Sequence, residues 1–289
     1  MSTATTAAST ATTAAITADA LPARNRALPL GRVTQLRLVR SEWTKLWSLR
    51  STRWSLLVAF VAQAGLPVLF AAVKMSRWGQ MSPADRASLN SIDIAGAGWR
   101  LSQLAIGVLG VLVISGEYST GMIRSSLMAA PKRLPVLWAK LGVFAAVTFV
   151  TMLIATFISF FGVQAVVSQH HIQHTLSDAG ALRVVFGAAL FLTVLGTLCT
   201  GLGTLLRNTA GGIAAFVFLI LVLPGLVEIL PTPLNDQVNE YLPSTAGTGI
   251  ASVTNHGLHL APWAGLGLFA GYAALAIAAA AVGMLRRDA

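Results

Sequence analysis

One stretch of the chain, residues 54–73, has 20 residues and no charged side chain. An α-helix rises about 1.5 Å per residue, so this stretch can cross the roughly 30 Å hydrocarbon core of a bilayer. Charged residues make up only 10% of the 289 residues, against about a quarter in soluble domains. The sequence therefore predicts an all-α polytopic membrane protein.

Six apolar segments are long enough to be spans, approximately residues 54–73, 99–118, 137–167, 184–206, 211–230 and 262–285. The second segment reaches spanning length only if Gly116 to Tyr118 extend it. The third is longer than a span requires, so we expect it to tilt or project, with Lys140 reaching back to the surface at its inner end. Pro224 predicts a kink near the outer end of the fifth segment.

The basic residues are distributed unevenly between the two sides of the predicted membrane. With the N-terminus inside, 15 of the 20 lysines and arginines fall on the inner side and five on the outer side. Both termini are therefore predicted to be cytoplasmic. The net charge of +10 does not indicate nucleic acid binding, because these residues flank apolar spans and form no basic domain. Five tryptophans near predicted span ends fit interfacial anchoring: Trp54, Trp78, Trp99, Trp138 and Trp263.

The part of the chain before the first span has two compositions. Residues 1–30 are rich in Ala, Thr and Ser and predict a disordered cytoplasmic tail. Residues 32–50 predict an amphipathic helix at the inner membrane surface, with Arg40 at the edge of its apolar face. That face comprises Val33, Leu36, Val39, Trp43, Leu46 and Trp47. The alternative is a helix packed against a partner protein.

A polar, basic run between the second and third spans, residues 116–133, has the pattern of a short helix. Ser119 or Thr120 can cap its start, and Pro131 ends it, since a proline disfavours helical geometry in the preceding residue. Its apolar side chains share one face: Met122, Ile123, Leu127 and Ala130. Either another protein binds this element or it is an ordinary cytoplasmic loop.

The sequence has no motif for nucleotide or hydrolytic chemistry. GxxxxGK[ST], HExxH and GxSxG are all absent, so the chain is predicted not to be an enzyme and not to hydrolyse ATP through a phosphate loop. The single cysteine, Cys199, can form no disulfide within the chain. The histidines fall in outer segments without a nearby carboxylate, and we expect solvated side chains and no metal site: His170, His171, His174, His256 and His259.

Charges inside a bilayer are costly and mark functional sites. The predicted spans hold almost none, and Glu228, near the outer end of the fifth, is interpreted as an interfacial carboxylate. This absence argues against proton- or sodium-coupled transport. Neutral polar residues can serve as interhelical hydrogen bonds or substrate contacts: Gln63, Gln103, Thr148, Thr151, Thr156 and Ser159. Glycines predict close helix packing: Gly196, Gly201, Gly203, Gly267 and Gly271.

Residues 31–289 resemble the membrane subunits of ATP-binding-cassette (ABC) transporters of the type-2, exporter-like permease family, in an actinobacterial-looking form. The resemblance is carried after the second span by Glu117, Gly121, Leu127, Pro131 and Arg133. Residues 41–57, SEWTKLWSLRSTRWSLL, are similar to the family's amphipathic connecting helix that leads into the first span. The run 118–120 departs from the more charged run of many members.

The resemblance implies a permease domain over residues 31–289 in a bacterial plasma (inner) membrane. Two copies, or two related chains, would sit on two copies of a cytoplasmic ATPase that binds ATP and Mg²⁺, and residues 120–130 would be the coupling helix. The implied coupling residues are Glu117, Gly121, Arg124, Leu127, Pro131, Lys132, Arg133 and Arg207, with Asn208 beside the last. The implied substrate path runs along spans two and five, with Leu104, Val108, Val111, Phe216, Leu219 and Leu223 as wall residues.

Because that wall is apolar, the resemblance implies export of a hydrophobic or amphipathic compound, such as a drug, a peptide antibiotic or a lipid. Two alternatives come from other classes. One is a six-span sensor or scaffold that moves no solute. The other is an intramembrane enzyme, for which the sequence offers no catalytic group.

Overall fold

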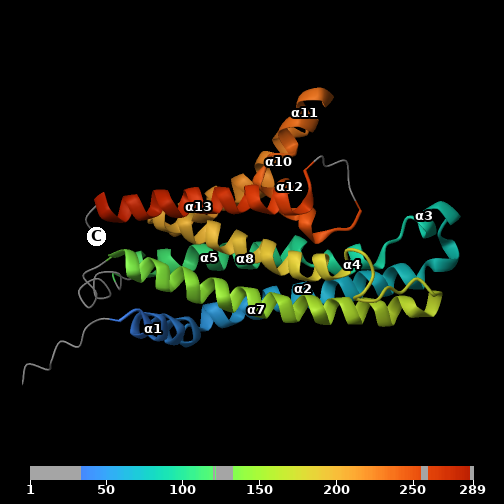
Figure 1. Ribbon diagram of the computed structural model, residues 1–289, viewed down its shortest axis with the longest axis horizontal. Helices are drawn as coiled ribbons and strands as arrows, with labels where there is room; N and C mark the ends of the chain where they lie inside the picture. The colour runs from blue at the N-terminus through green and yellow to red at the C-terminus, as the bar shows by residue number, and fades with distance from the viewer. Residues whose placement is uncertain (1–33, 120, 122–132, 255–259, 287–289) are drawn as a thin grey trace, which may run out of the picture. The chain divides into compact units, whose positions relative to one another are not determined.

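The computed structural model describes residues 34–119, 121, 133–254 and 260–286 (Figure 1). In these ranges the chain forms helices and no β-strand, and six helical stretches are long and apolar enough to cross a membrane. The predicted all-α fold with six spans is confirmed. The predicted tail of residues 1–30 and nearly all of the predicted coupling helix lie outside the described residues.

The six spans follow the predicted order. They are α2 (Arg50–Ser76), α4 (Ser91–Gly96) with α5 (Trp99–Ser119), α7 (Arg133–Val167), α8 (Ala181–Leu206), α9 (Thr209–Val217) with η3 (Phe218–Val222) and α10 (Leu223–Val227), and α13 (Pro262–Arg286). The second span ends at Ser119, which confirms the expected extension. The fifth is interrupted by the π-helical stretch η3 next to Pro224, where the kink is predicted.

Shorter helices flank the spans. They are α1 (Gln35–Ser48), η1 (Trp78–Gln80), α3 (Pro83–Ala87), η2 (Ser168–His170), α11 (Thr232–Asn239), α12 (Pro243–Thr248) and η4 (Gly249–Ala251). The last three lie in the segment between the fifth and sixth spans. Asn90 caps α4, because its side chain accepts from the backbone N–H groups of Ile92 and Asp93.

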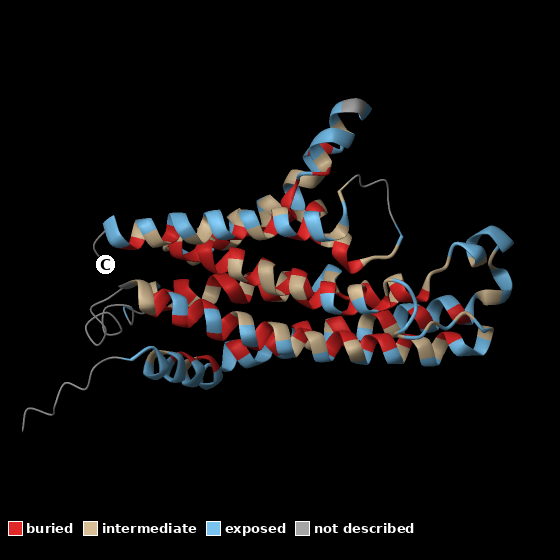
Figure 2. Cartoon of the chain, viewed as in Figure 1, coloured by how far each residue is buried: buried red, intermediate tan, exposed pale blue. Residues whose placement is uncertain are grey.

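The span α8 lies at the centre of the bundle. It packs against α5, α7 and α13, while α2 packs against α5 and α7. Buried residues follow the faces where these helices meet, and the outward faces are exposed (Figure 2). The largest fully buried side chains are aromatic: Phe144, Phe160, Phe191, Phe216 and Phe269. Since the outward faces are also apolar, the bundle suits lipid surroundings.

Glycines allow α5 and α8 to approach each other closely. A Cβ added at Gly110 would lie 2.5 Å from the carbonyl oxygen of Gly196, and one at Gly203 would lie 3.0 Å from that of Val111. The prediction of close packing is thus confirmed for Gly196, Gly201 and Gly203. For Gly267 and Gly271 it is not met within the chain, because no atom lies within 4 Å of an added Cβ.

Hydrogen bonds between neutral side chains and neighbouring helices cross the bundle interior. Gln63 Nε2 on α2 donates to Thr156 Oγ1 on α7 at 3.0 Å. Ser159 Oγ on α7 donates to the carbonyl oxygen of Ala95 on α4 at 2.8 Å. These side chains hold helices together, as one of the two predicted roles requires.

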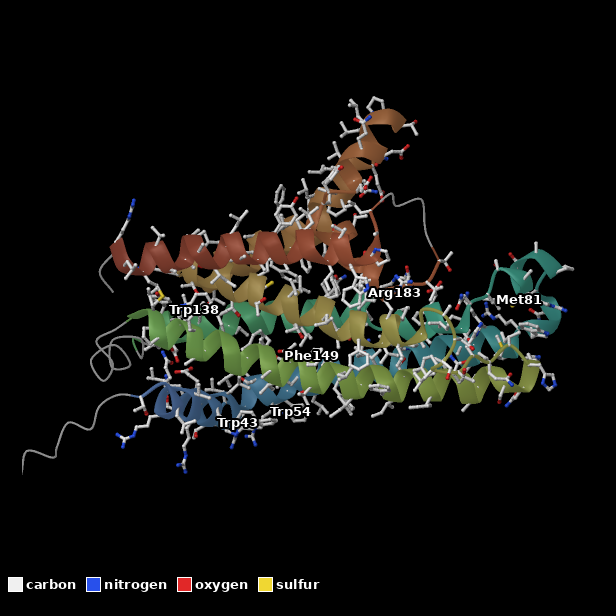
Figure 3. The ribbon with its side chains drawn as sticks, in the orientation of Figure 1. Trp43, Trp54, Met81, Trp138, Phe149 and Arg183 are labelled. Carbon is white, nitrogen blue, oxygen red and sulfur yellow. The ribbon has the colours of Figure 1, made fainter. Side chains whose placement is uncertain are left out.

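The tryptophans predicted to lie at the membrane interface differ in how far they are exposed. Trp54, Trp138 and Trp263 are exposed, as interfacial anchors would be, and Figure 3 labels the first two in the half of the bundle that carries α1. Trp99 was expected to be interfacial and is not. Because α4 lengthens the second span by two turns, Trp99 lies inside it and packs edge-on against Phe191 at 5.5 Å.

Candidate functional site

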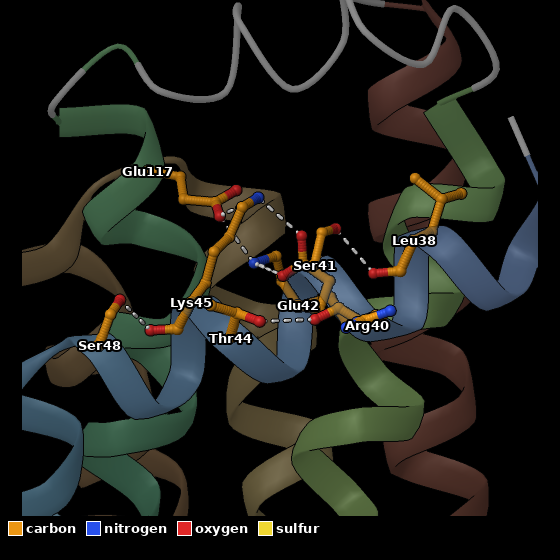
Figure 4. A network of polar contacts seen from close by, with 9 residues as sticks. Leu38, Arg40, Ser41, Glu42, Thr44, Lys45, Ser48 and Glu117 are labelled. Carbon is orange, nitrogen blue, oxygen red and sulfur yellow. Dashed lines mark hydrogen bonds and ion pairs between the residues drawn. The ribbon is translucent and has the colours of Figure 1, made fainter. Parts of the chain in front are cut away.

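Four charged side chains from three helices meet at the end of the bundle where α1 lies. Glu42 and Lys45 come from α1, Glu117 from the end of α5 and Lys140 from the first turns of α7 (Figure 4). The side chains of Glu42, Glu117 and Lys140 are only 4–6% exposed, and that of Lys45 is 32% exposed. We call these four residues the charge cluster.

The charge cluster is held by four hydrogen-bonded ion pairs. Lys45 Nζ donates to Glu42 Oε1 at 2.7 Å and to Glu117 Oε1 at 3.2 Å. Lys140 Nζ donates to Glu42 Oε2 at 2.6 Å and to Glu117 Oε1 at 2.9 Å. Each lysine therefore binds both carboxylates, and the two lysines together tie α1, α5 and α7. The remaining carboxylate oxygen, Glu117 Oε2, is buried and has no hydrogen-bond partner among the described residues.

The charge cluster shifts the pKa values of Glu42 and Lys45, its two members on α1. Burial alone would raise the pKa of Glu42, but the ammonium groups of Lys140 and Lys45 outweigh burial and hold that pKa below its ordinary value. Burial alone would lower the pKa of Lys45, but its hydrogen bond to Glu42 and the charges of Glu117 and Glu42 raise it. Glu42 and Lys45 are therefore both charged at neutral pH.

The sequence of α1 explains why this helix can reach the cluster. Glu42 and Lys45 are three residues apart, so both side chains lie on the same side of the helix, and Leu46 on that side is buried too. Leu36, Trp43 and Trp47 are exposed on other sides. The predicted amphipathic helix is present, but Leu46 belongs to the side facing the bundle. In Figure 4, α1 crosses the helices α5 and α7.

A cavity of about 380 Å³ adjoins the charge cluster. It is bounded by α1, the start of α2, the end of α5 and the start of α7. Apolar side chains form much of its wall: Leu46, Leu49, Leu112, Val113 and Val143. Cluster side chains, including Glu117 and Lys140, also line it. The cavity can therefore take a molecule that combines apolar surface with a hydrogen-bond donor.

Lys140 corrects one prediction from the sequence. It was expected to reach back to the membrane surface, but its side chain is 4% exposed and pairs with Glu42 and Glu117. The two carboxylates that face it supply the negative charge that a buried ammonium requires. The prediction that the spans hold almost no charged residues is wrong at this end of the bundle. Glu117 lies in the second span and Lys140 in the third.

Only some of the predicted coupling residues lie in the part of the chain that the structure describes. Glu117 points into the charge cluster rather than away from the bundle. Gly121 is exposed, with a φ of 71° that favours glycine, and Arg133 begins α7. Four further residues lie outside the described residues: Arg124, Leu127, Pro131 and Lys132.

Arg207 lies close to the end of α5. Its guanidinium group is 5.3 Å from the ring centre of Tyr118, and its Nη2 donates to the carbonyl oxygen of Gly283 at 3.3 Å. Asn208, the next residue, caps α9 by accepting from the N–H of Gly211 at 3.0 Å. Arg207 thus contacts Tyr118, the residue that follows Glu117, although Arg207 and Glu117 are 90 residues apart in the sequence.

The predicted path residues fall into two groups. Val111 and Phe216 are fully buried, and each lies against a glycine of the other helix: a Cβ added at Gly212 would be 2.6 Å from Val111, and one at Gly107 would be 2.3 Å from Phe216. These two side chains pack spans two and five together. The other four are partly buried: Leu104, Val108, Leu219 and Leu223. The first three of them pack around the same core.

The prediction that the histidines are simply solvated is wrong for His170 and His174, whereas His171 is exposed. His174 Nδ1 lies 2.7 Å from Ser91 Oγ, which is fully buried, and the ring of His170 stacks on Trp78 at 4.5 Å. Within the described part of the chain, no three His, Cys, Asp or Glu side chains gather in a way that would hold a metal ion. His256 and His259 lie outside the described residues.

In comparisons with known proteins, no protein-family model and no curated protein matches this chain.

Proposed function

We propose that this chain is the membrane subunit of an ATP-driven ABC exporter of the type-2 permease family, with its ATPase on a separate chain. Its six apolar spans fit such a subunit, and the lack of a phosphate-loop motif requires a separate motor. The proposed site of action is a bacterial plasma membrane, with a second copy of the chain or a related chain beside it.

The charge cluster is the observation that carries the proposal. The predicted coupling segment connects α5 to α7, and the cluster joins these same two helices through Glu117 and Lys140. It also joins α7 to α1 through Lys140 and Glu42, and α5 to α1 through Glu117 and Lys45. A force applied to the connection would act on both helix ends, and the two ion pairs Lys45–Glu117 and Lys140–Glu42 would pass it to α1. Arg207, which lies over Tyr118, would carry it to α8 and α9.

The proposed cargo is a hydrophobic or amphipathic compound. Since Val111 and Phe216 are occupied in packing α5 against α9, we assign the path to the four partly buried residues Leu104, Val108, Leu219 and Leu223. Their side chains are all aliphatic, so they would favour apolar cargo over ions.

Crosslinking from single cysteines tests the partnership. The native Cys199 is fully buried, which keeps the background low. Ser119→Cys, at the exposed end of α5, should crosslink to a co-purifying subunit that hydrolyses ATP. Ser82→Cys, exposed in the loop before the second span, should not. A partner without nucleotide hydrolysis would instead support the sensor or scaffold, and crosslinking from position 82 would reverse the assigned orientation.

Arg133→Gln tests the coupling itself. We expect the reconstituted complex to keep hydrolysing ATP while substrate no longer stimulates turnover and transport falls. Arg77→Gln, an exposed arginine at the opposite end of the first span, is the matched control and should transport normally. Normal transport by the Arg133 variant would remove this residue from the coupling contact.

A further inference from the structure

The cavity beside the charge cluster is lined by a buried group with an unused bonding capacity. Glu117 is 5% exposed, and its Oε1 accepts from both lysines of the cluster. Its Oε2 accepts from no described residue. Buried carboxylate oxygens normally have partners, because an unpaired one loses its hydration without compensation. A hydrogen-bond donor placed in the cavity would remove this deficit.

The charge balance restricts what that donor can be. The two carboxylates and two ammonium groups of the cluster already cancel, and three of the four side chains are 4–6% exposed. A simple cation or anion entering the cavity would leave one charge uncompensated in a poorly solvated place. A zwitterion brings a donor to Glu117 without changing the net charge, so the cavity favours a ligand with an ammonium group and a linked anion.

The surroundings of the cavity match such a ligand at a membrane surface. The apolar residues Leu112, Val113 and Val143 line it and suit hydrocarbon. The Lys45 side chain is 32% exposed, and Arg50 at the start of α2 is also exposed, so both can meet an anion at the rim. The exposed apolar side chains of α1 indicate that this helix lies at the level of lipid headgroups.

We propose that this cavity binds the headgroup of a phosphatidylethanolamine lipid from the surrounding bilayer. The primary ammonium donates to Glu117 Oε2, the phosphodiester lies near Lys45 at the rim, and the acyl chains follow the apolar wall. A volume of about 380 Å³ lies within the range of small-molecule sites, about 300–1,000 Å³. A quaternary ammonium has no N–H, so phosphatidylcholine cannot donate this hydrogen bond.

A lipid series tests the proposal on the wild-type protein. The full chain in nanodiscs is equilibrated with phosphatidylethanolamine, its N-methyl and N,N-dimethyl forms, and phosphatidylcholine, all with the same acyl chains, and bound lipid is measured by native mass spectrometry. The first three should be retained alike, and phosphatidylcholine about tenfold less, as expected for a charge-assisted hydrogen bond. Equal retention of all four would overturn the proposal, as would equal retention of phosphatidylglycerol.

Two variants place the lipid in this cavity. Gly116 lines it and has no atom within 4 Å of an added Cβ, so Gly116→Leu should fill the space and abolish the preference for the ethanolamine lipid. Gly65→Leu is the matched control, because Gly65 has the same free surroundings but is exposed on α2. Glu117→Gln should abolish the preference too. If that variant does not fold, the lipid series and the Gly116 variant decide, and an unchanged preference in the latter would refute the site.

Discussion

The helix α5 is held by opposite chemistry at two places seven residues apart. At Gly110 it meets α8 through apolar contacts so close that an added Cβ would lie 2.5 Å from a backbone oxygen of α8. At Glu117 it meets α1 and α7 through charged side chains, with a cavity of about 380 Å³ beside them. The contact at Gly110 leaves no room for an added atom, whereas the contact at Glu117 has a cavity on one side.

This difference predicts how each contact responds to movement. Dispersion contacts lose a quarter to a half of their energy when a gap of 0.5–1 Å opens. The attraction between charges falls only as the inverse of distance. The charge cluster can therefore follow a displacement of helix ends that the glycine crossing cannot. We infer that α5 is fixed near Gly110 and adjustable at Glu117, as a subunit driven from its cytoplasmic end would need.

Removing one ammonium group from the charge cluster should have the largest effect. In Lys140→Met, two buried carboxylates are left with Lys45 alone, and the uncompensated charge should lower the free energy of unfolding by about 3–5 kcal/mol. Thermal unfolding in detergent measures this loss. Lys74→Met, an exposed lysine at the other end of α2, is the control and should change stability by less than about 0.5 kcal/mol.

A second substitution separates charge from packing. Adding Glu117→Gln to Lys140→Met returns the net charge to zero and keeps the 2.7 Å pair between Lys45 and Glu42. The double variant should recover part of the lost stability. If it is less stable than Lys140→Met alone, the loss came from the packing of the lysine stem and not from unbalanced charge.

The glycine crossing should respond almost as strongly to a single methyl group. Gly110→Ala places a Cβ against the carbonyl oxygen of Gly196, which cannot turn aside as a side chain can. Overpacking of this kind costs about 1–3 kcal/mol. Gly116 lies nearly two turns along the same helix, and no atom of the described residues lies within 4 Å of a Cβ added there, so Gly116→Ala should be neutral or slightly stabilising. Equal effects of the two substitutions in thermal unfolding would contradict the tight crossing.

Much of the fold can be predicted from the sequence because membrane spans leave a strong local signal. A run such as residues 54–73 can be recognised as a membrane span by its length and its lack of charged residues. The misplacement of Trp99 shows the limit of that signal. Residues 91–96 include Ser91 and Asp93 and are not strongly apolar, so only the capping by Asn90 and the packing of α4 on α7 reveal that the span begins there.

The candidate site could not be predicted in the same way, because its members come from separate parts of the chain. Lys140 follows Glu117 by 23 residues and Glu42 by 98 residues. Taken alone, a lysine near the end of an apolar segment indicates snorkelling. Glu42 lies in a helix whose predicted apolar face consists of other residues, so the pattern gives no indication that the Glu42 side chain is buried. One usable signal was the scarcity of acids, since Glu42 and Glu117 are the only acidic residues near the predicted inner ends of the first three spans.

A neutral hydrogen bond inside the bundle should matter less than either contact of α5. Ser159→Ala removes the 2.8 Å bond to the carbonyl oxygen of Ala95. Interhelical hydrogen bonds in membrane proteins contribute about 0.6 kcal/mol on average, so the loss should be near that value in thermal unfolding. Ser168→Ala is the control, because its exposed hydroxyl bonds only within its own segment, to Ala165. A loss above about 2 kcal/mol would give Ser159 a larger role than we assign.

The smallest expected effect is that of pH on the charge cluster near neutrality. The pKa of Glu42 is lowered on folding, so its stabilising contribution is present above its ordinary pKa and is lost as pH falls through the lowered value. The pKa of Lys45 is raised, so its contribution is present below its ordinary pKa and is lost as pH rises through the raised value. Glu117 faces Lys45, and Lys140 faces Glu42. Between the ordinary values of a glutamate and a lysine, about 4.3 and 10.4, the contributions of Glu42 and Lys45 should not change with pH.

The stability difference between the wild type and Glu42→Gln isolates this behaviour, because protonated Glu42 resembles glutamine in charge and shape. That difference, measured by thermal unfolding in detergent, should stay constant from about pH 6 to 9 and shrink only below the ordinary pKa of a glutamate, about 4.3. If it instead shrinks between pH 6 and 7, Glu42 is protonated near neutrality, and the ammonium groups do not outweigh burial. Mild acid would then weaken the contact of α1 with α7 through Lys140, whereas the glycine crossing, which has no titratable group, would be unaffected.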